Sequence, residues 1–267
     1  MDRLLEVMSR LRDPDGGCPW DVEQTFETIS AYTIEEAYEV AEAIADGNVA
    51  EIRKELGDLL FQVVFYAQMA RERGDFDFSD ITKSVSDKMI ERHPHVFSDE
   101  SVESTKAQAV AWETTKANER AARAKAEGRA ASVLDDVTPG FPALMRAQQL
   151  QKRAARVGFD WPDVDGVLAK IAEESEEIKA EIRAGEEIEN TTRIEAEIGD
   201  MLFSLVNLSR WTGTDAEVAL RGANRRFEKR FRHIETSLAA QNRLTTDASL
   251  EELENLWQAA KLAETET

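Results

Sequence analysis

Apolar side chains recur along this chain at the spacing of helix turns. The pattern is clearest in residues 52–70 and 194–208, where the period is close to 3.6 residues, which predicts an amphipathic helix in each stretch. Only 13 glycines and 6 prolines interrupt 267 residues, and strand patterns are nearly absent. The pattern therefore predicts an all-α fold of the helical-bundle type.

Glycines predict where several of these helices end. A helix over 35–46 is expected to end at Gly47, and the next helix is expected to begin near Asn48. Gly185 has the matching place later in the chain. Gly74 and Gly213 are expected to end the two long helices.

The same pattern occurs twice, once in each half of the chain. Glu35 matches Glu173 and Asp58 matches Asp200, in the same order and at nearly the same separation. Both copies share E-x-x-E and E-x-G-D spacings, so a chance likeness of Glu- and Leu-rich helices explains the repeat poorly. A stretch of small residues followed by two prolines separates the copies. The predicted organisation is an N-terminal domain of 1–121, a linker of 122–142 and a C-terminal domain of 143–267.

Composition narrows the functional classes. The chain has 53 acidic and 33 basic residues and a net charge of -20, which argues against a broad nucleic-acid surface. The single cysteine, Cys18, rules out a disulfide within one chain and fits a reducing compartment. No apolar run approaches the roughly 20 residues of a membrane span, and the N-terminus lacks an apolar signal core. We therefore expect a cytoplasmic protein that has no membrane partner.

A few acidic residues of the second copy are spaced so that they share helix faces. They fall on two successive predicted helices, three or four residues apart, beside apolar positions. Two like charges 4 Å apart repel by about 4 kcal/mol at an effective dielectric of 20, so a cation should neutralise the group. The residues are Glu173, Glu174, Glu177, Glu197 and Asp200.

Hard carboxylate oxygens without a nearby Cys or His select Mg²⁺, Mn²⁺ or Ca²⁺ over zinc. A di-iron site usually needs Glu-x-x-His motifs, which this chain lacks, so we expect Mg²⁺, with Mn²⁺ as a substitute. The simpler alternative is that these acids are exposed and pair with Lys or Arg on their own helix. A second candidate metal site in the first copy comprises Glu36, Glu39, Glu55 and Asp58.

Several short motifs are spread over nearly the whole chain. They are GCPWD (17–21), EEAYE (35–39), ELGDLLFQVVFYAQMA (55–70), RHPHVF (92–97), GFDW (158–161), EESEE (173–177) and EIGDMLF (197–203). Together they resemble those of the MazG family of nucleoside triphosphate pyrophosphohydrolases, in its two-domain bacterial form. The E-E-x-x-E and E-x-x-D motifs are common to the wider all-α NTP pyrophosphatase superfamily, and the other motifs narrow the resemblance to MazG. The resemblance implies a helical fold, a homodimer, magnesium dependence, and cleavage of NTPs and dNTPs of any base between the α and β phosphates.

The resemblance implies that the second copy is catalytic, and its basic residues agree because phosphoryl chemistry needs cations on the phosphates. Tyr32 stands in the first copy where Lys170 stands in the second, and Ser86 stands where Asn224 does. The first copy is therefore a degenerate site or a dimerisation or regulatory module. The family commonly has lysine at two of the positions where this chain has arginine, Arg193 and Arg226. The expected phosphate ligands are Lys170, Arg193, Arg226 and Arg230.

The remaining roles follow from this assignment. Glu174, Glu177, Glu197 and Asp200 are expected to bind the metal and support catalysis, and Glu173 to hold the metal-bound substrate or a water. Trp257 either contacts the nucleoside or is a core residue. Two other functions stay open: a helical scaffold that binds Mg²⁺ without catalysis, and a pyrophosphatase narrow for one modified nucleotide.

Overall fold

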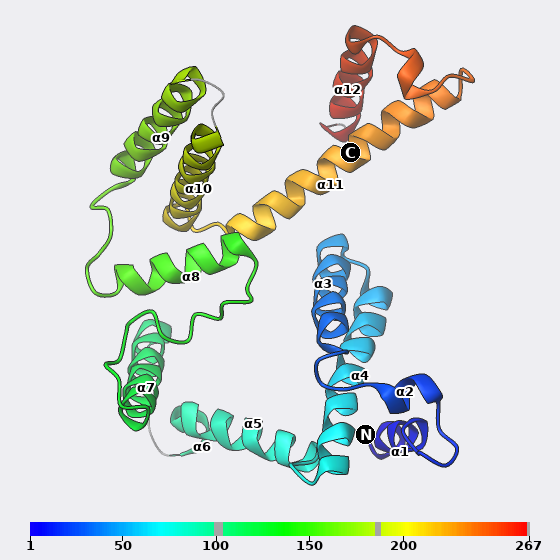
Figure 1. Cartoon of the computed structure of the whole chain (residues 1–267), viewed down its shortest axis with the longest axis vertical. Coiled ribbons are helices and arrows are strands. Elements are labelled where there is room, and N and C mark those ends of the chain that lie inside the picture. Colours follow the sequence, from blue (N-terminus) through cyan, green and yellow to red (C-terminus); the bar gives the residue numbers. More distant parts are fainter. Residues whose placement is uncertain (99–103, 185–187, 266–267) are drawn as a thin grey trace. The chain divides into compact units, whose positions relative to one another are not determined.

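The computed structural model describes residues 1–98, 104–184 and 188–265, with the side chains of 105–112, 184–190 and 265 outside that description. Every regular element in these ranges is a helix, so the predicted all-α fold is confirmed (Figure 1). None of these helices is long and apolar enough to cross a bilayer. The chain divides into two compact units, Met1–Thr115 and Lys116–Thr267.

The first unit is organised around a helical hairpin. In that hairpin α3 packs against α4, and α1 packs on the far part of α4. The core lies where these helices meet, and its buried members include Met8, Val64 and Phe65. The helices are α1 (Asp2–Leu11), α2 (Pro19–Glu23), α3 (Ser30–Asp46), α4 (Val49–Arg73), α5 (Phe78–Arg92), α6 (Pro94–Phe97) and the first part of α7 (Thr105–Ala126).

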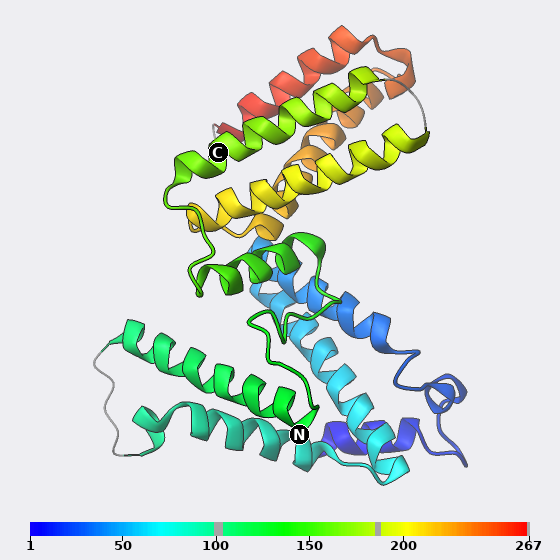
Figure 2. The same ribbon diagram turned by 60° about the vertical axis from the view of Figure 1, so that its left-hand side comes forward.

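The second unit repeats the hairpin. Here α9 packs against α10, α8 packs on α10 and α11, and α12 returns along α11 (Figures 1 and 2). The pairing of α8 with α10 matches that of α1 with α4. The helices are α8 (Ala143–Ala155), α9 (Val164–Ala184), α10 (Ile188–Trp211), α11 (Ala216–Ala239), the short 3-10 turn η1 (Thr245–Asp247) and α12 (Leu250–Thr265).

The helix ends follow local chemistry. Gly47 and Gly74 end α3 and α4 with φ of 69° and 75°, a left-handed conformation that glycine adopts without steric cost. The Asn48 side chain then accepts hydrogen bonds from two backbone N–H groups and caps α4. Gly213 follows α10 with φ of 71°. These predicted ends are confirmed, and Gly185 lies outside the described residues.

The segment between the two copies is partly helical. Helix α7 continues to Ala126, so the predicted linker of 122–142 comprises its last residues and the loop that precedes α8. The division between the compact units falls within α7, at Thr115.

Part of the predicted apolar face of α10 is not covered by the residues that the structure describes. Ile198 and Leu202 are each 45% exposed, and Leu205 is 41% exposed. The 3.6-residue period placed them correctly on one face of a helix, but the neighbouring helices cover only part of that face. A contiguous exposed apolar surface of this kind is typical of an interaction site.

Arg12 ties the loop after α1 to the end of α4. Its guanidinium bonds to the Glu72 carboxylate at 2.6 and 2.9 Å and donates to the backbone carbonyls of Asp21 and Gln24. Arg12→Met leaves partly buried acceptors without a donor, so we expect it to destabilise the first unit by about 1–3 kcal/mol. Faster hydrogen exchange of the α4 amides would measure the loss. Arg10→Met, at an exposed position of α1, should change exchange little, and equal effects would contradict this role for Arg12.

Candidate active site

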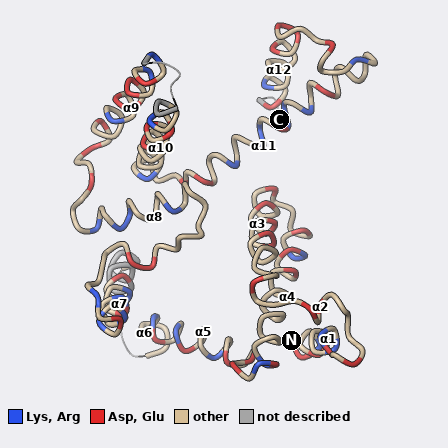
Figure 3. Tube along the Cα trace, in the orientation of Figure 1, with Lys and Arg blue, Asp and Glu red and all other residues tan. Residues whose placement is uncertain are grey.

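Three carboxylates converge between the two helices of the second hairpin. Glu174 comes from α9, whereas Glu197 and Asp200 come from neighbouring turns of α10. One oxygen of each lies within 4.8 Å of the others, and we call these three residues the second acidic cluster. Figure 3 shows acidic positions along α9 and on the facing part of α10. Glu174 is only 2% exposed, so its charge is held in the interior rather than on a solvated face.

The electrostatics of the second acidic cluster are unbalanced. Burial raises the pKa of Glu197, and the neighbouring charges of Glu177, Glu174 and Asp200 raise it further. One cation, Lys170, bonds to Glu174 at 2.7 Å and to Glu173 at 2.9 Å. Those bonds raise the pKa of Lys170 and keep it charged. Glu177 thus lies close enough for its charge to raise the pKa of Glu197, although it is not one of the three converging residues.

The residues fit a hard divalent cation. One oxygen of Glu174, Oε2, is buried and has no hydrogen-bond partner among the described residues, which is costly for a carboxylate unless a cation supplies the interaction. Oxygens bound to one Mg²⁺ at about 2.1 Å lie within about 4.2 Å of each other, so three oxygens that already lie within 4.8 Å of one another need at most a small contraction. The donor set is all carboxylate, as Mg²⁺ and Mn²⁺ prefer.

The first hairpin carries a similar group, the first acidic cluster, formed by Glu36, Glu55 and Asp58. Burial raises the pKa of Glu36, and nearby acids add to the shift. Glu55 differs, because a hydrogen bond from Lys54 at 2.8 Å lowers its pKa. Buried oxygens of Glu36 and Glu55 also lack a partner in the described part of the chain, so these residues could hold a cation as well. Glu39, also expected there, is not one of these three residues, and burial and the neighbouring charge of Glu55 raise its pKa.

The structure does not gather all the expected phosphate ligands at the second acidic cluster. Arg193 lies one turn before Glu197 on α10 and pairs with Glu181 at 2.8 Å. Arg230 of α11 pairs with Glu264 of α12 at 2.7 Å.

Arg230 also lies over the ring of Trp257 on α12, with 5.5 Å from its guanidinium carbon to the ring centroid. Trp257 packs against Phe227 at 5.3 Å, and Arg226 is exposed. Within the described part of the chain, no hydrogen bond or ion pair joins Arg226, Arg230 or Trp257 to the acidic cluster.

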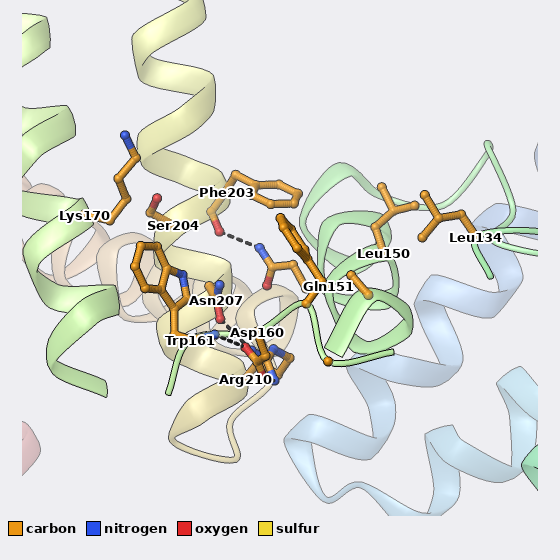
Figure 4. A pocket seen from close by; sticks show the side chains of 13 residues that line it. Leu134, Leu150, Gln151, Asp160, Trp161, Lys170, Phe203, Ser204, Asn207 and Arg210 are labelled. Carbon is orange, nitrogen blue, oxygen red and sulfur yellow. Dashed lines mark hydrogen bonds and ion pairs between the residues drawn. The ribbon is translucent and has the colours of Figure 1, made fainter. Parts of the chain in front are cut away.

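A cavity beside the second acidic cluster was not predicted. It has a volume of about 610 Å³ and lies between α8, the loop of 158–161 and α10, and we call it the α8–α10 cavity (Figure 4). Lys170 lines it and also bonds to Glu174, so the cavity and the cluster adjoin. Its lining includes the side chains of Gln151, Trp161, Phe203, Asn207 and Arg210.

The GFDW motif builds one wall of this cavity. Asp160 forms an ion pair with Arg210 of α10, which includes a 2.9 Å bond to Arg210 Nη1. Trp161 packs over Gly166 of α9, where a Cβ would approach its ring to 2.7 Å. Glycine is therefore required for this close contact. The sequence contained no sign that Trp161 lines a cavity.

The protein is therefore an all-α protein of tandem helical hairpins, each with a cluster of carboxylates that could hold a metal ion. Residues 24–97 and 164–235 match the family of the MazG nucleotide pyrophosphohydrolase domain. The nucleoside triphosphate pyrophosphohydrolase of Escherichia coli K12 is 51% identical over 264 residues, 99% of this chain and 98% of its own. The nucleoside triphosphate pyrophosphohydrolase/pyrophosphatase MazG of Thermotoga maritima is 41% identical over 260 residues, 97% of this chain and 95% of its own. The chain belongs to the MazG family, which confirms the resemblance found in its motifs.

Proposed function

We propose that the second unit hydrolyses nucleoside triphosphates to nucleoside monophosphate and pyrophosphate, with Mg²⁺ held by the second acidic cluster. The observation that carries this proposal is the buried oxygen of Glu174, which has no hydrogen-bond partner among the described residues and lies among converging carboxylates, next to a cavity of nucleotide-compatible size. The family match supports it, as do the names of the Escherichia coli and Thermotoga maritima relatives, both called nucleoside triphosphate pyrophosphohydrolases.

The chain's own residues position the reaction. Glu174, Glu197 and Asp200 hold the cation, with Glu177 as a fourth carboxylate near Glu197. When bound, Mg²⁺ offsets charge on the phosphates and lowers the pKa of a coordinated water. Lys170 can exchange a bond to Glu173 or Glu174 for one to a phosphate oxygen.

When Lys170 moves to a phosphate oxygen, Glu173 loses its bond to Lys170 and can hold a water or the metal-bound substrate. Arg193, on the helix face of Glu197, can reach the phosphates if it leaves Glu181.

We further propose that the active form is a homodimer in the cytoplasm. Support comes from the exposed apolar residues Ile198, Leu202 and Leu205 of α10, which a second copy would cover. Arg226, Arg230 and Trp257 keep their expected substrate roles in this proposal. These residues lie on α11 and α12, and in this proposal the dimer brings them to a phosphate or nucleoside.

The test is product identification with a panel of canonical and modified NTPs and dNTPs. With ATP and Mg²⁺ we expect AMP and pyrophosphate in equal amounts, similar turnover across bases, and Mn²⁺ as a working substitute. With EDTA turnover should stop. Release of ADP and phosphate would contradict the proposal. Mg²⁺ binding without turnover would favour a scaffold, and turnover of a single modified nucleotide would favour a narrow pyrophosphatase.

A further inference from the structure

Each helical hairpin is joined by the chain at one end and held by an arginine at the other. The chain connects the end of α9 to the start of α10, so the start of α9 and the end of α10 lie at the open end of that hairpin. There Arg210 of α10 pairs with Asp160, which lies just before α9, and one of the two bonds measures 2.9 Å. In the first unit Arg12 bonds to Glu72 near the end of α4 and to carbonyls of the segment that precedes α3. In both units an arginine therefore connects the two sides of the open end.

The two units make this connection with charges on different elements. Aligning Asp58 with Asp200 in the two E-x-G-D motifs pairs Gln68 with Arg210. Gln68 carries no charge and donates to Glu72 at 2.9 Å. The first unit takes its arginine from outside the hairpin and its acid from α4, whereas the second takes its arginine from α10 and its acid from the loop before α9. The connection, rather than one particular residue, is what the two copies share.

Asp160 and Arg210 are fixed by further contacts. Their side chains are 25% and 14% exposed, and Arg210 also donates to Asn207 at 2.8 Å (Figure 4). Asp160 accepts a hydrogen bond from the backbone N–H of Trp161 at 2.9 Å. The ring of Trp161 lies against Gly166 in the first turn of α9, where a Cβ would have no room. Arg210 is therefore connected to the start of α9 through Asp160 and Trp161.

The helices that this connection joins also carry the second acidic cluster. Gly166 lies about two turns before Glu174 on α9, and Asn207 lies about two turns after Asp200 on α10. A change in the separation of the helices at their open end would therefore change the distance between the carboxylates. A Mg²⁺ site is sensitive to such a change because the ion demands nearly ideal octahedral geometry.

We propose that Asp160 and Arg210 form a clamp at the open end of the α9–α10 hairpin and act as positioning residues for the cation site. This inference rests on the proposed function. The carboxylates of the second acidic cluster repel one another, which favours separation of the two helices. The clamp opposes this separation and keeps the carboxylates within reach of one cation before the cation binds. A preorganised site binds more tightly because less ordering remains for the binding step.

The test follows Mn²⁺ binding by electron paramagnetic resonance, on the chain that carries Glu36→Gln and Asp58→Asn so that the first acidic cluster is disabled. We expect Asp160→Asn to weaken Mn²⁺ binding by about tenfold, the lower end of the effect of residues that orient metal ligands. Arg210→Gln should weaken it by the same factor. The double variant should lose no more than either single variant, because each change removes the same ion pair. A loss of about a hundredfold in the double variant would mean that the two residues act separately, and would overturn the inference.

Gly166→Ala tests the same connection on the side of α9. Alanine favours a helix more than glycine does, but its Cβ would displace the ring of Trp161. We expect weaker Mn²⁺ binding together with unchanged helicity by circular dichroism. Wild-type affinity in Gly166→Ala or in Asp160→Asn would overturn the inference.

Glu252→Gln is the matched control. Glu252 of α12 accepts two bonds of 2.6 and 2.8 Å from Arg243, an ion pair of the second unit that lies outside the hairpin. This variant should keep the Mn²⁺ affinity of the starting chain, even where thermal unfolding shows lower stability. An equal loss of affinity in Glu252→Gln and Asp160→Asn would show a general effect of destabilisation and overturn the inference alone. A starting chain that binds no Mn²⁺ would overturn the proposed function and the inference together.

Discussion

Replacing Glu174 with glutamine is expected to lower kcat for ATP hydrolysis by about a thousandfold, the loss that follows when about 4 kcal/mol of metal-derived stabilisation is removed. Glu174 is 2% exposed and supplies the buried, unpartnered oxygen of the second acidic cluster. Glutamine has the same shape but no charge, and its amide nitrogen cannot bind a cation. The bond from Lys170 is also weakened. Steady-state kinetics with excess Mg²⁺ measure the effect, and circular dichroism should show unchanged helicity.

Glu36→Gln is the matched control for this variant. Glu36 has the corresponding position in the first acidic cluster, because the repeat aligns it with Glu174. If only the second unit is catalytic, Glu36→Gln should leave kcat within a few-fold of wild type. Wild-type turnover in Glu174→Gln would contradict the assignment of the site. A large loss in Glu36→Gln instead would mean that the first unit is the catalytic one.

The second large effect is the dependence of the free energy of unfolding on the metal. Mg²⁺ at 100 times its Kd should stabilise the folded wild-type chain by about 2.7 kcal/mol. Glu197→Gln should lose much of this gain at the second acidic cluster. In EDTA, however, Glu197→Gln should be more stable than wild type, because burial and neighbouring charges disfavour the ionised form of Glu197. Thermal unfolding with EDTA and with Mg²⁺ measures both changes.

The raised pKa of Glu197 fixes the sign of the pH dependence. The folded state holds this proton more tightly than the unfolded state, so metal-free stability should rise as pH falls through the raised pKa. Glu55 of the first acidic cluster is the opposite case, because its hydrogen bond with Lys54 lowers its pKa. Glu55→Gln should therefore reduce metal-free stability. If both variants shift metal-free stability in the same direction, the charge balance described for the two clusters is wrong.

Much of the fold and the centre of the site could be predicted because they depend on local patterns. Gly47 and Asn48 set the turn between α3 and α4 through their own backbone and side-chain preferences. The acids converge because residues three apart share a helix face, as Glu197 and Asp200 do, and because a short connection makes adjacent helices pack as a hairpin. These relations need no information about distant parts of the chain.

The remaining features of the site depend on which helices pack against one another, and the periodic spacing of apolar residues does not contain that information. Arg226 and Arg230 share a face of α11, as their spacing predicts. However, α12 packs along that helix, and its Glu264 forms an ion pair with Arg230. The α8–α10 cavity likewise depends on how α8 lies across α10. Gln151, which lines it, follows no motif and was not among the expected site residues.

The central claim is that carboxylates of the second unit hold a divalent cation that a triphosphate shares. Electron paramagnetic resonance of Mn²⁺ tests it most directly, on the chain carrying Glu36→Gln and Asp58→Asn so that the first acidic cluster is disabled. We predict one bound Mn²⁺ per chain, tighter binding in the presence of an α,β-methylene ATP analogue, and loss of binding when Glu174→Gln is added. Mn²⁺ that fails to bind, or that stays bound after Glu174→Gln is added, would contradict the account.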